Sequence, residues 1–322
     1  MVALPVPGPP PLEPLPFRKG APLSICQSFS EFQATARPGV KWLVHGLIPK
    51  PGRFLLVGLP KVGKSNLALQ IALAVSQGKD FLGSQVEQGR VLFLQFDATD
   101  FEWKDRFDTL KEAGVDLSGD NLVVKPEAMM LPFNTQNLQH QVWLEHVLDE
   151  VKPDLVVIDV LRELHTADED SSTEMKNACS PLFHILRPYS SLILHHTTKL
   201  QEGVDADPIK AARGSGYISG AVSAIGLLHN KKLRVKSRLA GELELRGHMN
   251  DIGFWVFDDD NLRATEIKEA LLREVAAHPE LSGHALYNQI IKPQFGLSRS
   301  SFFRKVGGAL HARAQQSSPK AL

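Results

Sequence analysis

The residues from Gly58 to Ser65 combine glycines, a lysine and a hydroxyl at a spacing suited to phosphate chemistry. The segment Gly-Leu-Pro-Lys-Val-Gly-Lys-Ser matches the pattern G-x-x-x-x-G-K-S/T at every fixed position. Glycines let backbone N–H groups approach phosphate oxygens closely, and the positive end of a following helix adds to that attraction. We expect Lys64 to reach the terminal phosphates of ATP and Ser65 to bind Mg²⁺. The expected nucleotide contacts are Gly58, Pro60, Lys61, Val62, Gly63, Lys64, Ser65 and Asn66.

Two carboxylates follow apolar runs that resemble buried strands. Asp159 ends the run Leu-Val-Val-Ile-Asp, and Asp97 follows the run Val-Leu-Phe-Leu-Gln-Phe. A carboxylate at the end of a central parallel strand lies beside a phosphate loop, so we expect Asp159 to be the second Mg²⁺ ligand. Asp97 is the best-placed base for the attacking water, and a purely structural carboxylate is the alternative.

A histidine pair ends a further apolar run, Ser-Leu-Ile-Leu-His-His. We expect His195 to sense the γ-phosphate from the end of its strand, with a satisfied structural histidine as the alternative. No further histidine or cysteine accompanies His195 and His196 at ligand spacing, which argues against a zinc site.

Strand-like and helix-like segments alternate through the first two thirds of the chain. This alternation predicts an α/β fold with a mostly parallel sheet and helices on both of its faces. The expected strands are 54–58, 91–96, 122–125, 155–159 and 191–195, and the expected helices are 65–76, 102–113, 136–151 and 174–186. Four strands joined by short turns, at 222–228, 232–238, 243–247 and 254–257, predict an antiparallel extension of that sheet.

Changes in composition divide the chain into four parts. A proline-rich arm covers 1–38, a core that carries the phosphate loop covers 39–262, and a small helical unit covers 263–314 before a disordered tail at 315–322. The residues from 263 onward include nine basic and four acidic side chains. Their helix, Gly-containing turn and final helix predict a helix-turn-helix of winged-helix type, with a protein-docking module as the alternative. The candidate DNA contacts there are Arg299, Arg304 and Lys305.

The overall composition excludes several classes of protein. The 36 basic and 36 acidic residues cancel, which excludes binding to nucleic acid through bulk charge but allows a local basic patch. Two isolated cysteines, Cys26 and Cys179, exclude a disulfide framework and a cysteine-rich zinc site. No apolar run is long enough for a membrane helix, and the proline-rich start does not resemble a signal peptide. These features predict a cytoplasmic protein with no membrane partner.

Taken together, these motifs resemble the RepA-type branch of the RecA-like ATPases, which is related to DnaB-type replicative helicases and KaiC-like ATPases. Beyond the phosphate loop, the resemblance rests on four segments between about Val40 and Phe257. They are Val156 to Asp170, His195-His-Thr-Thr-Lys199, Arg213-Gly-Ser215 and Lys236-Ser-Arg238.

The resemblance implies a RecA-like P-loop core that assembles into a homo-oligomeric ring, usually a hexamer, with ATP between subunits. Lys236 and Arg238 would reach into the neighbouring subunit's site, where cations neutralise developing charge; two exposed strand cations are the alternative. The loop with Lys199, Lys210 and Arg213 would face single-stranded DNA in the ring channel, with a solvated surface loop as the alternative.

One residue departs from the family pattern. The family usually has Glu where this chain has Asp97, which is one methylene shorter. A shorter side chain predicts slow hydrolysis or an ATP site that mainly controls assembly.

These expectations combine into an ATP-dependent DNA helicase or translocase that replicates a plasmid, phage or mobile element. A primase or an initiator is the expected candidate partner. The alternatives are a non-motor ATPase of the same fold, such as a loader or a recombinase-like filament, and a DNA-binding regulator whose oligomerisation ATP controls.

Overall fold

A computed structural model describes residues 28–34, 39–125, 133–197, 206–212, 216–258 and 270–295, together with 302–303, 306–307 and 309–310. The chain divides into two units, Met1–Gly39 and Val40–Leu322. Within the first unit, the described part is the short helix α1 (Phe29–Ala34) with its neighbouring residues.

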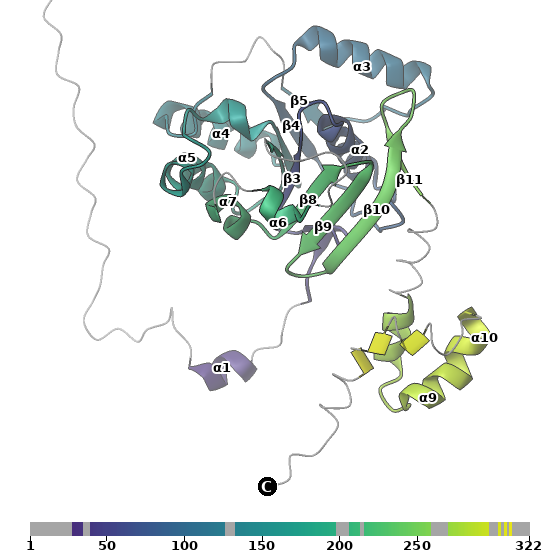
Figure 1. Ribbon diagram of the computed structural model, residues 1–322. Coiled ribbons are helices and arrows are strands. Elements are labelled where there is room, and N and C mark those ends of the chain that lie inside the picture. The colour runs from purple at the N-terminus through teal and green to yellow at the C-terminus, as the bar shows by residue number, and fades with distance from the viewer. Residues whose placement is uncertain are drawn as a thin grey trace, which may run out of the picture. The chain divides into compact units, whose positions relative to one another are not determined.

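A nine-stranded sheet forms the centre of the second unit (Figure 1). Its strand order is β11-β10-β9-β8-β3-β7-β6-β4-β5. The strands from β5 to β8 pair in parallel, whereas β8, β9, β10 and β11 pair antiparallel, so both expectations for the sheet are confirmed. The bounds are β3 Arg53–Gly58, β4 Val91–Gln95, β5 Leu122–Val124, β6 Leu155–Asp159, β7 Ser190–His196, β8 Ala224–His229, β9 Lys232–Ser237, β10 Gly241–Met249 and β11 Trp255–Phe257. A separate small sheet pairs β1 (Trp42–Val44) with β2 (Ile48–Pro49).

Helices cover both faces of the large sheet. One face carries α2 (Lys64–Gln77) and α3 (Asp100–Glu112), and the other carries α4 (Leu138–Val151), α5 (Ser172–Ile185) and α7 (Gly216–Ala221). The short helix η2 (Leu161–Leu164) follows β6. The short helix α6 (Pro208–Ala211) precedes α7.

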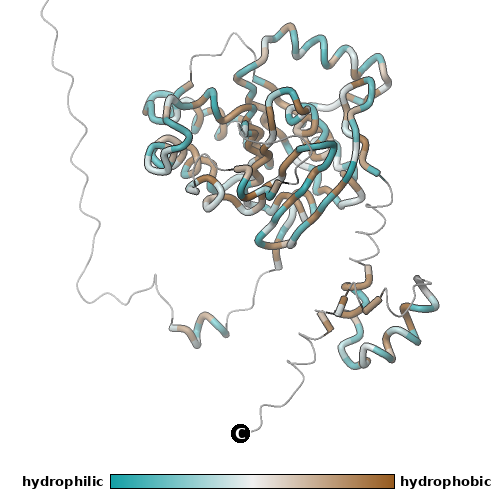
Figure 2. Tube along the Cα trace, viewed as in Figure 1, coloured by the Kyte–Doolittle hydropathy of each residue, from teal (hydrophilic) through white to brown (hydrophobic). Residues whose placement is uncertain are grey.

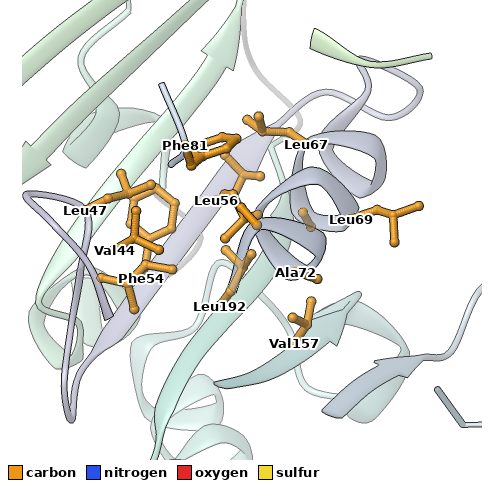
Figure 3. Close-up of a cluster of buried hydrophobic side chains, with 14 of the residues drawn as sticks. Val44, Leu47, Phe54, Leu56, Leu67, Leu69, Ala72, Phe81, Val157 and Leu192 are labelled. Atoms are coloured by element: carbon orange, nitrogen blue, oxygen red, sulfur yellow. The ribbon is translucent and has the colours of Figure 1, made fainter. Parts of the chain in front are cut away.

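Each face of the sheet has its own apolar core, because successive side chains of a strand point to opposite sides. In β3, Phe54 and Leu56 join the cluster under α2, whereas Leu55 and Val57 join the cluster under α4 and α5. Figure 3 shows Leu56 of β3 and Ala72 of α2 among the side chains of the first cluster. The hydropathy colouring of Figure 2 shows hydrophobic residues gathered where the sheet and the helices meet.

Helix α3 begins at a fully formed capping box. The Thr99 side chain accepts a hydrogen bond from the Glu102 N–H, while the Glu102 carboxylate accepts from the Thr99 N–H at 2.7 Å. A cap of this kind fixes where the helix starts and which way the preceding chain enters it. The turn that carries Asp97 is therefore anchored at its end.

The described residues after 270 are mainly helical and have an apolar cluster of their own. They comprise helical residues 270–277, α9 (Gly283–Leu286), the π-helical η3 (Tyr287–Ile291) and α10 (Lys292–Phe295). Leu271, Ile291 and Phe302 are fully buried members of the cluster. The candidate DNA contacts Arg299, Arg304 and Lys305 lie outside the described residues, and the predicted boundary near 262 does too.

Among the described residues, no helix has both the length and the apolar character required to cross a membrane.

Candidate nucleotide-binding site

Lys64 lies inside the loop that joins β3 to α2. Its side chain is only 5% exposed, and its Nζ donates to the carbonyl oxygens of Gly58 at 3.0 Å and Leu59 at 2.9 Å. The same Nζ lies 3.0 Å from Nδ1 of His196. Burial lowers the pKa of Lys64 to about 8, although the charges of Asp159 and Asp97 oppose that shift. The ammonium group is thus held under the loop by acceptors that a phosphate can replace.

Asp159 and Ser65 meet at the carboxyl end of β6. The Asp159 carboxylate is 3% exposed and is hydrogen-bonded to the Ser65 side chain. Burial, together with the charge of Asp97, raises the pKa of Asp159 to about 6. A hydroxyl and a carboxylate fit Mg²⁺, which prefers oxygen ligands, takes few of them from protein and keeps several waters. No group of three or more His, Cys, Asp or Glu side chains suited to a metal occurs in the described residues.

Asp97 lies just beyond β4, at the mouth of the same site. Burial raises the pKa of Asp97, whereas the charges of Lys64 and of Arg106 in α3 oppose the shift. Asp97 in turn raises the pKa of Asp159, so the two carboxylates are close enough to interact. The structure therefore gathers Lys64, Ser65, Asp159 and Asp97 around one loop.

Gln95 is a residue of this site that the sequence reasoning missed. It is 2% exposed and lies directly opposite Asp159 in the parallel register of β4 and β6, on the face that carries the phosphate loop. Its Oε1 accepts from the Ala98 N–H at 2.9 Å, which helps to fix the turn that carries Asp97. Its buried Nε2 has no hydrogen-bond partner among the described residues. In the sequence, Gln95 could have been recognised as a site residue because it is a polar residue near the end of an apolar run.

The structure does not bring His195 to the phosphate loop. In β7, Leu192 and Leu194 belong to the cluster under α2, and His196 continues that face toward Lys64. His195 points to the opposite face, where it is 2% exposed, and burial lowers its pKa to about 4 with a further contribution from His165. The period of two along the strand therefore assigns the phosphate-side position to His196.

Lys236 and Arg238 lie far from the phosphate loop of their own chain. Gly58 is aligned with Leu228 of β8, whereas the other end of β8 is aligned with Ser237, about 13 Å away along the strand. Lys236 pairs with Asp207 at 2.6 Å and Glu242 at 3.2 Å. Arg238 donates to the Gly220 carbonyl at 2.7 Å. The bonds that these two cations make are therefore to residues outside the phosphate loop.

Of the candidate channel residues, the structure describes Lys210. It lies in α6, whose first turn is capped by the Asp207 carboxylate, which accepts from the N–H groups of Ile209 and Lys210. Lys199 and Arg213 lie outside the described residues.

A cavity of about 370 Å³ adjoins the phosphate loop between α2, α3 and the β10–β11 turn. Its lining includes Asn66, which follows Ser65, together with Phe101 and Arg106 from α3 and Phe254 from the turn. This volume suits a small planar ligand, and an aromatic ring and a guanidinium are groups that can stack on one.

We predict that Asp159→Asn stabilises the nucleotide-free protein near neutral pH. The buried carboxylate has a pKa of about 6 in the folded protein, against an ordinary value of 3.8. Between these two values the folded state binds more protons than the unfolded state, so the protein loses stability as the pH rises from 3.8 to 6. The variant removes a penalty of about 3 kcal/mol above pH 6. Thermal melts at pH 7.5 and pH 5 should show a gain that narrows on acidification, and a gain independent of pH would contradict the prediction.

Comparisons with known proteins assign the chain to a family. The family model AAA_25, described as an AAA domain, matches residues 19–202, which is more than half of the chain. A comparison with curated proteins gives no significant match. A KaiC-like protein from the archaeon Pyrococcus horikoshii is similar with 13% identity and a TM-score of 0.45, over 67% of this chain and 93% of that one. A DnaB-like replicative helicase, solved in a study of its interactions with primase, is similar with 14% identity and a TM-score of 0.49, over 70% of this chain and 66% of that one.

The strand order adds an independent argument. The phosphate-loop strand β3 lies between β7 and β8, and one strand separates it from β6, which carries Asp159. This order places the loop, the acidic strand and the antiparallel extension as in a RecA-like core. Together with the family match, it confirms the expected fold: the chain belongs to the AAA-domain family AAA_25 and has a RecA-like P-loop core.

Proposed function

We propose that this chain is a Mg²⁺-dependent ATPase of the ring-helicase type, which moves on single-stranded DNA during replication of a plasmid, phage or mobile element. The observation that carries the ATPase part is the convergence of Lys64, Ser65, Asp159 and Asp97 on one loop. The helicase part rests on the motifs shared with RepA-type and DnaB-type proteins.

Hydrolysis would use these side chains in distinct roles. Lys64 exchanges the carbonyls of Gly58 and Leu59 for the β- and γ-phosphates, while Ser65 and Asp159 hold Mg²⁺. Bound Mg²⁺ supplies positive charge that stabilises the transferred phosphoryl group. Asp97 accepts a proton as the water oxygen bonds to the γ-phosphorus and the bond to the β–γ bridging oxygen breaks. Burial raises the pKa of Asp97, which strengthens it as a base.

The base of the nucleotide would occupy the cavity beside Asn66. Arg106 offers a planar guanidinium on the α3 side, and Phe254 offers a ring on the side of the β10–β11 turn. Both groups can stack on a purine.

In a ring, cations of one subunit would reach the nucleotide site of the next subunit and the DNA in the channel. Lys236 and Arg238 would complete the nucleotide site of the next subunit of a hexamer, which agrees with their distance from their own loop. Lys210, with Lys199 and Arg213, would track the phosphates of single-stranded DNA in the channel. Arg299, Arg304 and Lys305 would bind duplex DNA or dock a primase or initiator. We expect such a ring to act in the cytoplasm.

A non-motor ATPase is the second candidate. It is favoured by Asp97, whose carboxylate is one methylene shorter than the Glu that motor relatives usually carry. In that case, ATP binding would control assembly or DNA binding rather than movement.

An ATPase assay with and without single-stranded DNA, paired with a mass measurement of the assembly, separates the two. Stimulated turnover together with unwinding of a forked duplex supports the motor. ATP-dependent assembly without stimulated turnover supports the second candidate and contradicts the first.

We predict that Arg238→Ala lowers ATP turnover at least about 100-fold in the assembled protein, because an arginine supplied in trans stabilises transition-state charge. The matched control is Arg234→Ala, since Arg234 lies on β9, the strand that ends just before Arg238, and pairs with Glu244 at 3.0 Å. Mixing Arg238→Ala with Lys64→Ala subunits should restore part of the activity, because sites with an intact Lys64 can receive Arg238 from the other variant. If mass measurement shows mixed rings and no activity returns, the trans role is wrong.

A further inference from the structure

The β10–β11 hairpin lies across the start of α2 (Figure 1). Gln70, on the second turn of α2, holds both backbone groups of Trp255: its Oε1 accepts from the Trp255 N–H at 2.8 Å, and its Nε2 donates to the Trp255 carbonyl at 3.1 Å. The Trp255 side chain is 7% exposed and stacks on Phe257. The hairpin is therefore hydrogen-bonded to α2, the helix that begins at the phosphate loop.

The Trp255 indole bonds directly to the loop. Its Nε1–H donates to the carbonyl oxygen of Gly63 at 3.1 Å, and the same oxygen accepts from the Leu67 N–H at 3.0 Å. Two donors thus fix the direction of the Gly63 carbonyl. In a trans peptide the C=O and the following N–H point in opposite directions, so this anchoring also sets the direction of the Lys64 N–H.

The hairpin approaches so closely that only glycine fits at position 63. Gly63 has a φ of +92°, and a Cβ atom there would lie 2.6 Å from Sδ of Met249 and 2.8 Å from Nε1 of Trp255. The second glycine of the phosphate-loop motif therefore serves the hairpin contact as well as the left-handed backbone.

From this geometry we propose that Trp255 is a positioning residue that preorganises the phosphate-binding N–H groups of the loop. By holding the Gly63 carbonyl, the indole aims the Lys64 N–H into the anion-binding hollow before a nucleotide arrives. Donation to the carbonyl also polarises the peptide and strengthens the opposite N–H as a donor. The inference rests on the proposed nucleotide site. It adds to that site Trp255, a residue near the C-terminal end of the core sequence.

The test compares Trp255→Phe, which keeps an aromatic ring but removes the N–H, with the wild type. We expect the Kd for MgADP and the KM for ATP to rise about 3- to 10-fold, the range of one neutral hydrogen bond. We expect kcat to stay within about 2-fold, because the peptide is already in place once the phosphates are bound. The matched control is Trp143→Phe, since Trp143 packs against the cluster on the other face of the sheet.

A spectroscopic readout separates positioning from packing. The ¹H–¹⁵N resonance of the Trp255 indole, assigned by its loss in Trp255→Phe, should shift when MgADP binds, whereas the Trp143 resonance should not. If Trp255→Phe does not fold, Gln70→Leu provides the second variant, because it releases the Trp255 backbone and should raise the same Kd.

The outcomes distinguish this inference from the function on which it rests. Wild-type protein that fails to bind MgADP overturns the nucleotide site itself. Wild-type binding with an unchanged Kd in folded Trp255→Phe, or a Trp255 resonance that does not respond to MgADP, overturns the positioning role alone.

Discussion

Replacing Lys64 with alanine is expected to weaken MgATP binding at least about 100-fold. The ammonium group is the buried cation of the loop, and a charge-assisted hydrogen bond to each of two phosphates contributes about 1.5–3 kcal/mol. Titration calorimetry on the purified chain measures the loss. Lys79→Ala is the matched control, because Lys79 follows the same helix and pairs with Asp116 at 3.5 Å on the surface.

The fold of Lys64→Ala should survive, which makes the result interpretable. Burial lowers the pKa of Lys64 to about 8, so holding the charged side chain in the loop costs free energy that alanine does not cost. We therefore expect a melting temperature no lower than that of the wild type. Retained MgATP binding in this folded variant would show that the nucleotide site is assigned to the wrong loop.

Replacing Asp97 with asparagine is expected to lower kcat for ATP hydrolysis by about 100-fold or more. Asparagine keeps the size of the side chain but cannot accept the proton of the attacking water, and general bases contribute about 10²–10⁴ in rate. The KM for ATP should change less than about 3-fold, since Asp97 lies at the mouth of the site and does not hold the loop. Steady-state kinetics with excess Mg²⁺ measure both parameters.

Asp97→Glu is the second variant at this position, and it tests the effect of side-chain length. It keeps the carboxylate and extends it by one methylene, so we expect turnover at least equal to that of the wild type. An Asp97→Asn protein that hydrolyses ATP normally would remove Asp97 from the reaction. A slow Asp97→Glu protein would show instead that the turn held by Gln95 and Thr99 is built for the shorter side chain.

Residues close in sequence made much of the site predictable. The phosphate loop lies between a predicted strand and a predicted helix, and both formed where the pattern placed them, β3 at Arg53–Gly58 and α2 at Lys64–Gln77. Asp159 could be placed because parallel strands end on one edge. Those inferences need only local periodicity and the rule that the carboxyl ends of parallel strands lie along one edge of the sheet.

Other features depend on register or on long-range pairing. The choice between His195 and His196 depends on which face β7 presents to α2, and a one-residue offset reverses it. Gln95 reads as a minor interruption of an apolar run until β4 is paired with β6. The bond between Trp255 and Gly63 has no local signal, because the two residues approach through the antiparallel extension of the sheet.

The hydrogen bond from Trp255 to Gly63 spans 192 positions of the chain. The phosphate-loop motif is therefore translated long before the residue that completes the site. During synthesis, a nascent chain that stops at Met249 already contains the whole loop and Asp159 but lacks the indole that anchors Gly63. Contacts this distant in sequence form late, because a long loop must close first. Tight nucleotide binding would then report that the sheet is complete through β11.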